Sequence, residues 1–155
     1  MWNLKRTILV GTTCAIAIAA PSLAYAATNK RAKSVKTTQR ITTLFTTAQG
    51  ATNVGTSDGR IARATVHGAL RAVATNTTPT TFTAKGTLFY RAGTLRYTLH
   101  GTATGNSDGS LTFIGSGTFT GGTGHYSGAH GSFTFTGTKP ANSFETWKLS
   151  GKVSA

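Results

Sequence analysis

Cysteine is almost absent from this chain, since its 155 residues include a single one, Cys14. One cysteine excludes a disulfide framework within the chain. Cys14 also lies in an N-terminal apolar segment that we expect to be removed, so the mature chain would carry no thiolate nucleophile. Stability must then come from side-chain packing and from the hydrogen bonds of the backbone.

Acidic residues are nearly as scarce, with 3 Asp and Glu against 16 Lys and Arg, which gives a net charge of +13. Asp58 and Asp108 each precede a glycine, a pattern typical of turns. Glu145 is therefore left without a second carboxylate, which argues against catalysis by a carboxylate pair. The excess of positive charge predicts attraction to anionic partners such as teichoic acid, phospholipid headgroups, nucleic acid or acidic glycans.

The first 26 residues have the pattern of a secretory signal peptide. Lys5 and Arg6 precede an apolar run over residues 7–20, and Ala24-Tyr25-Ala26 fits the small-x-small rule for cleavage. The run is too short to cross the bilayer comfortably, because a spanning helix takes about 20 apolar residues. We therefore expect cleavage after Ala26 and a secreted or cell-envelope location.

Residues 27–39 are polar and basic and show no periodicity, so we expect a disordered basic arm before the folded domain. The basic residues of the arm and its border are Lys30, Arg31, Lys33, Lys36 and Arg40. They are candidates for binding an anionic polymer of the cell envelope, and a merely solvated tail is the alternative. The arm has no aromatic residue, so the pattern does not favour specific binding of nucleic acid.

Residues 40–155 predict an all-β domain, because threonine, glycine and aromatic residues dominate and apolar residues alternate with polar ones. The alternating segments are 41–47, 60–75, 81–90, 94–100, 111–119, 132–136 and 144–153. The turn signals between them are 56–59, 76–79, 91–93, 106–109 and 139–142. Seven or eight antiparallel strands must bury their apolar faces together, in a sandwich or a closed barrel. Small residues on those faces, such as Gly115 and Gly117, favour the barrel.

The stretch GGTGHYSGAHGSFTF (residues 121–135) is the most distinctive of the chain. Its glycines miss the G-x-G-x-x-G spacing by one position, and no G-K-[ST] follows. Both phosphate-binding motifs need a helix N-terminus after the loop, whereas a strand is predicted here. We therefore expect a tight connection between two strands, in which Gly121, Gly122, Gly124, Gly128 and Gly131 allow positive φ angles and close packing.

Residues 115–131, GSGTFTGGTGHYSGAHG, resemble the G-G-T-G-[KR]-[FY]-x-G-A-x-G signature of the dirigent and allene oxide cyclase barrel superfamily. They are most similar to small secreted bacterial proteins of unassigned function, often actinobacterial, that carry this signature. His125 stands where the signature has Lys or Arg. The resemblance implies an eight-stranded antiparallel calycin-like β-barrel with a central apolar cavity, often in a homo-oligomer. Plant members bind reactive small molecules in the barrel and direct their cyclisation or coupling.

A ligand cavity of this kind would be lined by inward-facing apolar residues. The candidates are Phe82, Leu88, Tyr97, Phe113, Phe133 and Trp147. Glu145 shares the parity of Trp147, so it is predicted to point inward near the start of a strand, where burial would raise its pKa and suit a general acid. A rim position beside an arginine is the alternative. Tyr90, Tyr97 and Arg96 are weaker catalytic candidates.

The four histidines do not predict a metal site, and we expect no cofactor. His67 and His100 fall on the polar faces of strands, and His125 and His130 lie five residues apart in the loop without a third ligand. A Ser-His-Asp set is also disfavoured, because no acid is clearly placed to orient a histidine.

Three functions stay open on the sequence alone. The favoured one is a non-catalytic, exported barrel that binds a small apolar or aromatic ligand or associates with the anionic cell envelope. The second is a dirigent- or cyclase-like isomerase that acts on a small hydrophobic substrate in the cavity. The third is a purely structural envelope protein whose barrel is filled by its own side chains.

Overall fold

The computed structural model describes residues 31–155, so the predicted signal peptide, with its cleavage after Ala26, and residues 27–30 of the predicted arm lie outside the described residues. Within the described range the chain forms eight strands and one short 3-10 helix. These are β1 (Lys33–Thr47), β2 (Gly50–Ile61), β3 (Ala64–Asn76), β4 (Thr81–Tyr90), β5 (Gly93–Gly105), β6 (Leu111–Gly122), η1 (Gly124–Tyr126), β7 (His130–Lys139) and β8 (Glu145–Ser154). No helix of this part of the chain is long and apolar enough to cross a bilayer.

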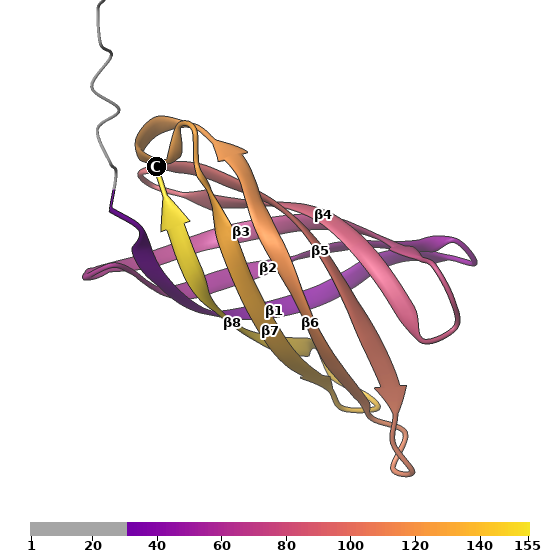
Figure 1. The fold of residues 1–155 in the computed structure, drawn as a ribbon. Coiled ribbons are helices and arrows are strands. Elements are labelled where there is room, and N and C mark those ends of the chain that lie inside the picture. Colours follow the sequence, from indigo (N-terminus) through magenta and orange to yellow (C-terminus); the bar gives the residue numbers. More distant parts are fainter. Residues whose placement is uncertain (1–30) are drawn as a thin grey trace, which may run out of the picture.

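The strands form one closed antiparallel barrel in sequence order, so the predicted eight-stranded calycin-like barrel is confirmed. Each strand pairs with the next, and β1 closes the barrel by pairing with β8 as well as with β2. The sheet is strongly twisted: in Figure 1, β1 to β3 run at a steep angle to β6, β7 and β8. Closure covers the edge of β1 from Lys33 to Ile41, which limits edge-to-edge aggregation, while the rest of β1 has no partner on that side among the described residues.

The predicted disordered arm is wrong from Lys33 onward, because β1 begins there. Val35, Thr37 and Gln39 point into the barrel and are buried, while Lys36 and Arg40 point outward. Only two of the four inward positions from Val35 to Ile41 are apolar, so the alternation that normally indicates a strand was too weak to detect. The strand is stabilised by its two neighbours, which pair with it along both sides.

The predicted turn at residues 56–59 is also wrong. Asp58 and Gly59 lie inside β2, opposite Thr38 and Thr37 of β1. The chain turns instead at Ala62-Arg63, where Ala62 has a φ of 55°, and this turn splits the predicted segment 60–75 into the end of β2 and all of β3. No Gly, Asn or Asp marks this turn, whereas Asp58-Gly59 is a strong turn signal in isolation.

The barrel interior is filled by rings that lie over glycines. Six inward-facing aromatic residues stand directly opposite a glycine of the neighbouring strand. The pairs are Phe82–Gly101, Tyr90–Gly68, Tyr97–Gly86, Phe133–Gly117, Phe135–Gly115 and Trp147–Gly137. A Cβ atom added at any of these six glycines would collide with the ring opposite or with a carbonyl beside it. The glycines therefore make room for the core, in addition to bending the sheet.

The two ends of the barrel differ in their connections. At one end, which we call the loop end, the turns β2–β3 and β4–β5 meet the segment between β6 and β7. Backbone hydrogen bonds join His125 to Ala92 (2.9 Å) and Thr123 to Thr94 (3.0 Å) there. The opposite end carries the β1–β2, β3–β4, β5–β6 and β7–β8 connections, and β1 continues there past its last pair with β8, Ile41–Glu145, into the β1–β2 hairpin (Figure 1).

Candidate functional site

The four predicted catalytic residues do not converge on one place. Tyr90 ends β4 at the loop end, whereas Glu145 begins β8 at the opposite end. Tyr97 is buried in the core, and Arg96, its neighbour in sequence, points to the outside of the barrel. Since an acid, a phenol and a cation must reach the same substrate atoms to act together, these residues form no common active site.

Glu145 does have the predicted inward parity and is half-buried opposite Ile41 of β1. Burial raises its pKa, and the positive charge of Lys139 partly offsets this effect. The Trp147 indole also lowers the pKa of Glu145. The indole Nε1 atom nevertheless makes no hydrogen bond within residues 31–155. Glu145 is thus a single, partly desolvated carboxyl group at the end of the barrel. The cation that affects its pKa is Lys139, whereas the alternative drawn from the sequence was a rim position beside an arginine.

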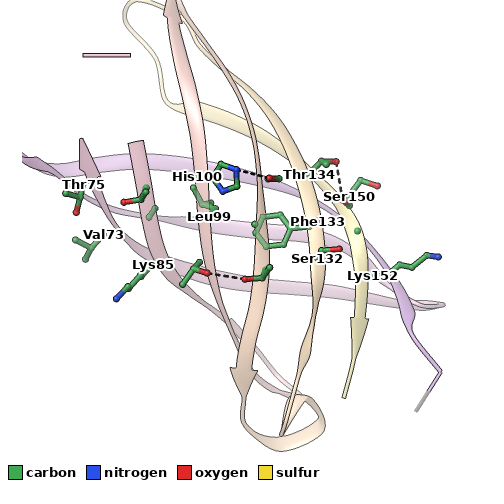
Figure 2. Close-up of a pocket in the computed structure, with 17 residues that line it drawn as sticks. Val73, Thr75, Lys85, Leu99, His100, Ser132, Phe133, Thr134, Ser150 and Lys152 are labelled. Carbon is green, nitrogen blue, oxygen red and sulfur yellow. Dashed lines mark hydrogen bonds between the residues drawn. The ribbon is translucent and has the colours of Figure 1, made fainter. Parts of the chain in front are cut away.

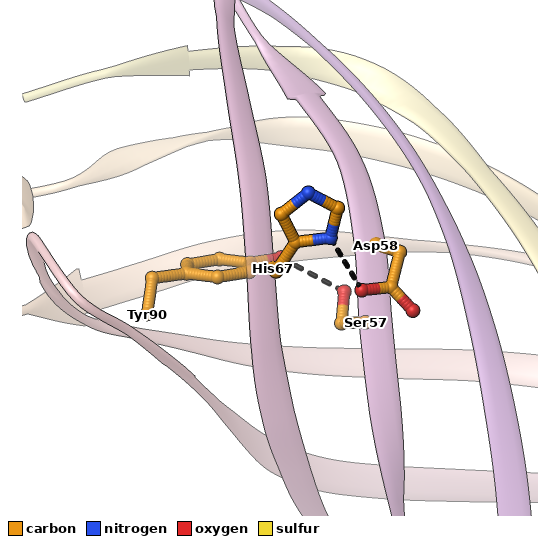
Figure 3. A network of polar contacts seen from close by, with 4 residues as sticks. All are labelled: Ser57, Asp58, His67 and Tyr90. Carbon is orange, nitrogen blue, oxygen red and sulfur yellow. Dashed lines mark hydrogen bonds and ion pairs between the residues drawn. The ribbon is translucent and has the colours of Figure 1, made fainter.

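A polar network at β2 and β3 brings a serine, an acid and a histidine together (Figure 3). The ring nitrogen Nδ1 of His67 lies 3.0 Å from Oδ1 of Asp58, so an acid does orient this histidine, contrary to the sequence prediction. Ser57, however, points into the barrel, where its hydroxyl is 2.8 Å from the hydroxyl of Tyr90. Because the side chains of Ser57 and His67 lie on opposite faces of the sheet, the three residues cannot act as a Ser-His-Asp triad.

Tyr90 and Tyr97 are structural rather than reactive. Burial raises the pKa of Tyr90 to about 12, against the weaker opposite effect of its hydrogen bond with Ser57. Burial also raises the pKa of Tyr97, whose ring packs edge-on against Phe133 at a centroid distance of 5.9 Å. Both phenols therefore stay protonated at neutral pH and do not supply a base.

The six predicted cavity residues fill the barrel instead of lining a hollow. All six side chains are buried, from 0% exposed for Leu88 to 8% for Phe82 and Trp147. An empty space of ligand size would leave them accessible surface, and they have almost none. Phe135 joins them and stacks on Trp147 with centroids 4.6 Å apart and planes within 5°. The interior is a solid aromatic core, as in the third of the functions considered above.

The glycine loop is a tight connection, as predicted. Gly124 and Gly128 have φ angles of 58° and 71°, in the left-handed region that favours glycine. The loop is not extended throughout, since Gly124–Tyr126 forms one turn of 3-10 helix and turns Tyr126 into the core. His125 and His130 are exposed, and no group of three metal-ligating side chains occurs among residues 31–155.

This loop borders a hollow of about 450 Å³ at the loop end of the barrel. Its apolar wall includes the rings of Tyr90 and Tyr126, whose centroids are 5.9 Å apart. Its cationic rim consists of Lys33, Arg63 and Arg91, and His125 lies beside them. The hollow has the size of a small-molecule site and contains no carboxylate.

The outer surface carries most of the charge, and its cations are not neutralised by neighbours. Thirteen of the sixteen Lys and Arg residues belong to the described range, since only Lys5, Arg6 and Lys30 lie outside it. Within that range no Lys or Arg side chain comes within 4.0 Å of a carboxylate, and the basic side chain that does so is His67, at 3.0 Å from Asp58. Such unpaired charges repel one another and attract a polyanion.

Several of these cations lie along a groove on the outside of the barrel, which we call the outer groove. One part, of about 1,030 Å³, crosses β3 to β8, and a second part, of about 420 Å³, continues over β7, β8, β1 and β2. The two parts share Thr134 and Ser150. Figure 2 shows the first part, with hydroxyl side chains over its floor and Lys85 and Lys152 near its two sides.

The register places one row of polar side chains across seven neighbouring strands of this surface. The row runs through Thr83, His100, Ser116, Thr134, Ser150, Lys36 and Arg60. At about 4.8 Å per strand the row follows the curved wall of the closed barrel for roughly 29 Å. Lys148 and Lys152 lie two residues on either side of Ser150, so each is diagonal to Lys36. Hydrogen bonds between His100 and Ser116 (3.2 Å) and between Thr98 and Thr118 (3.2 Å) order the floor.

The strongest concentration of charge is at Lys36, Arg60, Lys148 and Lys152, which we call the basic cluster. Lys36 and Arg60 stand directly opposite each other on β1 and β2, an arrangement of like charges that destabilises a sheet. The one acid at this part of the groove, Asp58, is in contact with His67. The like charges of this pair add to the positive potential of the surface, which attracts anions.

Sequence reasoning named Lys36 but missed the cluster. Lys148, Ser150 and Lys152 alternate with apolar residues and could be placed on an outer face. Lys36 falls in the segment predicted to be a disordered arm, so the sequence does not predict the contact between the first and the last strand. Of the arm cations, Lys36 and Arg40 lie on the outer face of β1, Lys33 borders the hollow at the loop end, and Arg31 precedes the strand.

Comparisons with known proteins identify no family for this chain. No family model matches the chain, and no curated protein sequence matches it either. Among solved structures the chain is similar to one named "Pyocyanin demethylase", with a TM-score of 0.37 and 18% sequence identity, over 74% of this chain and 98% of that one.

Proposed function

We propose that this chain is a non-catalytic, exported barrel that associates with an anionic polymer of the cell envelope through its outer groove. The observation that carries the proposal is the row of cations without carboxylate partners on a hydroxyl-lined surface, centred on the basic cluster. Lysine ammonium and serine or threonine hydroxyl groups both donate hydrogen bonds to phosphate oxygens. A polymer with phosphate groups in its backbone, such as teichoic acid, fits this surface best.

The groove is less suited to single-stranded nucleic acid. Such proteins interleave cations with exposed aromatic rings on which the bases stack. The two aromatic residues that border the groove, Phe133 and Phe135, direct their rings into the core and are 3% and 2% exposed. Charge and hydroxyl donors are thus present at the groove, while a stacking platform is missing from the residues that line it.

A non-catalytic role is supported by the separation of the candidate catalytic residues and by the filled interior. A dirigent- or cyclase-like isomerase, which the sequence resemblance implies, would need a substrate cavity with an acid in it. Glu145 is at the opposite end of the barrel from the hollow beside Tyr90 and Tyr126. An enzyme of this class therefore stays a prediction with less support than polymer binding.

Binding of purified wall teichoic acid at several salt concentrations tests the proposal. The variant K36Q/K148Q/K152Q removes three charges from the groove, and R63Q/R71Q/R91Q removes three charges elsewhere, so the two variants have equal net charge. Three surface contacts of up to about 0.5–1 kcal/mol each predict a loss of about tenfold or more for the first variant. The control is expected to lose much less. Equal losses in both variants would show that only net charge matters and would contradict the groove.

A second candidate function is the binding of a small aromatic anion in the hollow at the loop end. The rings of Tyr90 and Tyr126 and the cationic rim with no carboxylate favour such a ligand over a neutral apolar one. Native mass spectrometry of the purified protein tests it directly. A bound small molecule that is lost in Y126A would support this function, whereas a ligand-free protein under native conditions argues against it.

A further inference from the structure

The tip of the β1–β2 hairpin exposes two large apolar side chains side by side. Leu44 is 65% exposed and Phe45 is 64% exposed, the two highest values among the large hydrophobic residues of the described range. The pairing of β1 with β2 shifts between Thr43 and Phe45, which leaves Leu44 as the extra residue of a bulge. The bulge interrupts the inward and outward alternation of β1, so both side chains face solvent.

The hairpin is also free of charge, in contrast to the rest of the barrel. Residues 41–57, which form the end of β1, the turn and most of β2, contain no Asp, Glu, Lys or Arg. The nearest cation is Arg40, on the outer face of β1. Its guanidinium carbon lies 5.7 Å from the ring centroid of Phe144, which is 48% exposed. Since Glu145 pairs with Ile41, Phe144 lies between Arg40 and the tip along the strand.

Cation, half-exposed aromatic ring and uncharged apolar tip thus follow one another at this end of the barrel, where Phe144 lies beside β1 in the β7–β8 connection. This order matches the depth profile of a membrane interface. Cations pair with anionic headgroups, aromatic rings favour the headgroup region, and aliphatic side chains enter the acyl boundary. Pairing with β1 and β3 satisfies the backbone of β2 as far as Gly50, and the β1 backbone groups beyond Ile41 that face away from β2 can bond to water and headgroups at the membrane interface.

We propose that the β1–β2 hairpin anchors the barrel on a bilayer rich in anionic phospholipid, with Leu44 and Phe45 inserted into the headgroup–acyl boundary. Arg40 and Phe144 then lie at the headgroup level. The positive outer surface of the barrel supplies the long-range attraction, and the two apolar side chains supply the short-range one. This site is independent of the outer groove, since it uses a different part of β1 and different side chains.

A second copy of the chain is the competing occupant of an exposed apolar tip. Charge argues against it, because two barrels that each carry thirteen Lys and Arg against three acids in the described range repel each other. An anionic bilayer is attracted by the same charge. Charge complementarity therefore selects the lipid surface.

Co-sedimentation with vesicles tests the anchor, using the chain from Ala27 onward, which includes the whole barrel. The variant L44S/F45S is compared with the control F89S/I114S, which removes two exposed apolar side chains from elsewhere on the barrel. On vesicles of phosphatidylglycerol and phosphatidylcholine, we expect L44S/F45S to bind about tenfold or more weakly than the wild type, because both large apolar side chains that would be buried in the acyl boundary are lost. The control is expected to bind like the wild type, and pure phosphatidylcholine to bind weakly in all cases.

Phe45→Trp adds a readout of depth, since its emission shifts to the blue when the indole leaves water. A blue shift on the anionic vesicles supports insertion. The proposed insertion is overturned if the tryptophan emission of the vesicle-bound Phe45→Trp variant stays unchanged, or if L44S/F45S binds the vesicles as well as the wild type. A dimer of the wild type that L44S/F45S dissociates, without any difference on vesicles, would assign the tip to a second copy and also overturn the proposal. A failure of the barrel to bind teichoic acid would contradict the outer groove and would not affect this test of the anchor.

Discussion

Replacing Gly137 with alanine tests how tightly the barrel is filled. Gly137 lies on the inner face of β7, directly between Phe113 of β6 and Trp147 of β8. A Cβ atom built there would be 2.5 Å from Cδ1 of the Trp147 indole. Trp147 cannot move aside, because its ring stacks on Phe135 and contacts Phe113 at a centroid distance of 5.5 Å. Overpacking a filled core of this kind costs about 1–3 kcal/mol.

Gly105→Ala is the matched control for this substitution. Gly105 ends β5, and a Cβ atom there would have Leu111 Cδ2 at 3.9 Å as its nearest neighbour. Since glycine loses more chain entropy on folding than alanine, this change is expected to be neutral or to stabilise by up to about 1 kcal/mol. Urea unfolding of both variants, followed by far-UV circular dichroism, measures the difference. Equal midpoints for the two variants would refute the account of a solid interior.

Three further predictions concern buried polar groups. Tyr90→Phe leaves the Ser57 hydroxyl without its partner at 2.8 Å and is expected to lower the free energy of unfolding by about 1–3 kcal/mol, which denaturant unfolding measures. The raised pKa values of Tyr90 and Tyr97 mean that the folded state holds their protons more tightly than the unfolded chain. Stability is therefore predicted to fall as the pH rises above about 10, and an absorbance titration that shows free ionisation in the folded protein would contradict this. For Glu145 the raised pKa predicts that stability falls as the pH rises above the ordinary value of 4.5, and that Glu145→Gln removes this fall in a series of melting curves.

The barrel itself was predictable from alternation, because six of its strands carry an apolar face and are separated by recognisable turns. The segments 81–90 and 111–119 coincide with β4 and with most of β6. The turn at residues 106–109 is confirmed, with the backbone N–H of Ser110 donating to Asp108 Oδ1 at 2.9 Å. Local chemistry specified these elements, so no knowledge of distant contacts was needed.

The start of β1 and the end of β2 could not be predicted from the sequence, because tertiary contacts override the local sequence signals there. The inner face of β1 carries Thr37 and Gln39, polar residues that are buried only because β8 and β2 enclose them. The Gln39 Nε2 and Thr37 Oγ1 atoms find no hydrogen-bond partner among residues 31–155. The Asp58-Gly59 pair has the chemistry of a turn, yet its neighbours on both sides hold it in a strand.

The candidate sites were less predictable than the fold. Alternation assigned Lys148 and Lys152 to an outer face, but only the pairing of the first strand with the last brings them next to Lys36. The apolar side chains predicted to line a cavity have the correct inward parity. The rings occupy the space that their glycine partners leave open, and this depends on the cross-strand register, which a single sequence does not reveal.

The most direct test of the outer groove is a nuclear magnetic resonance titration of the barrel with teichoic acid. The account predicts that the backbone amide signals that shift lie on β1 and β8 around Lys36, Lys148 and Ser150, and continue over Thr134 and Ser116. Signals from the loop end, around Tyr90 and Tyr126, are predicted to stay in place. Shifts concentrated at the loop end, or no localised shifts at all, would contradict the proposal that this barrel acts through its outer surface.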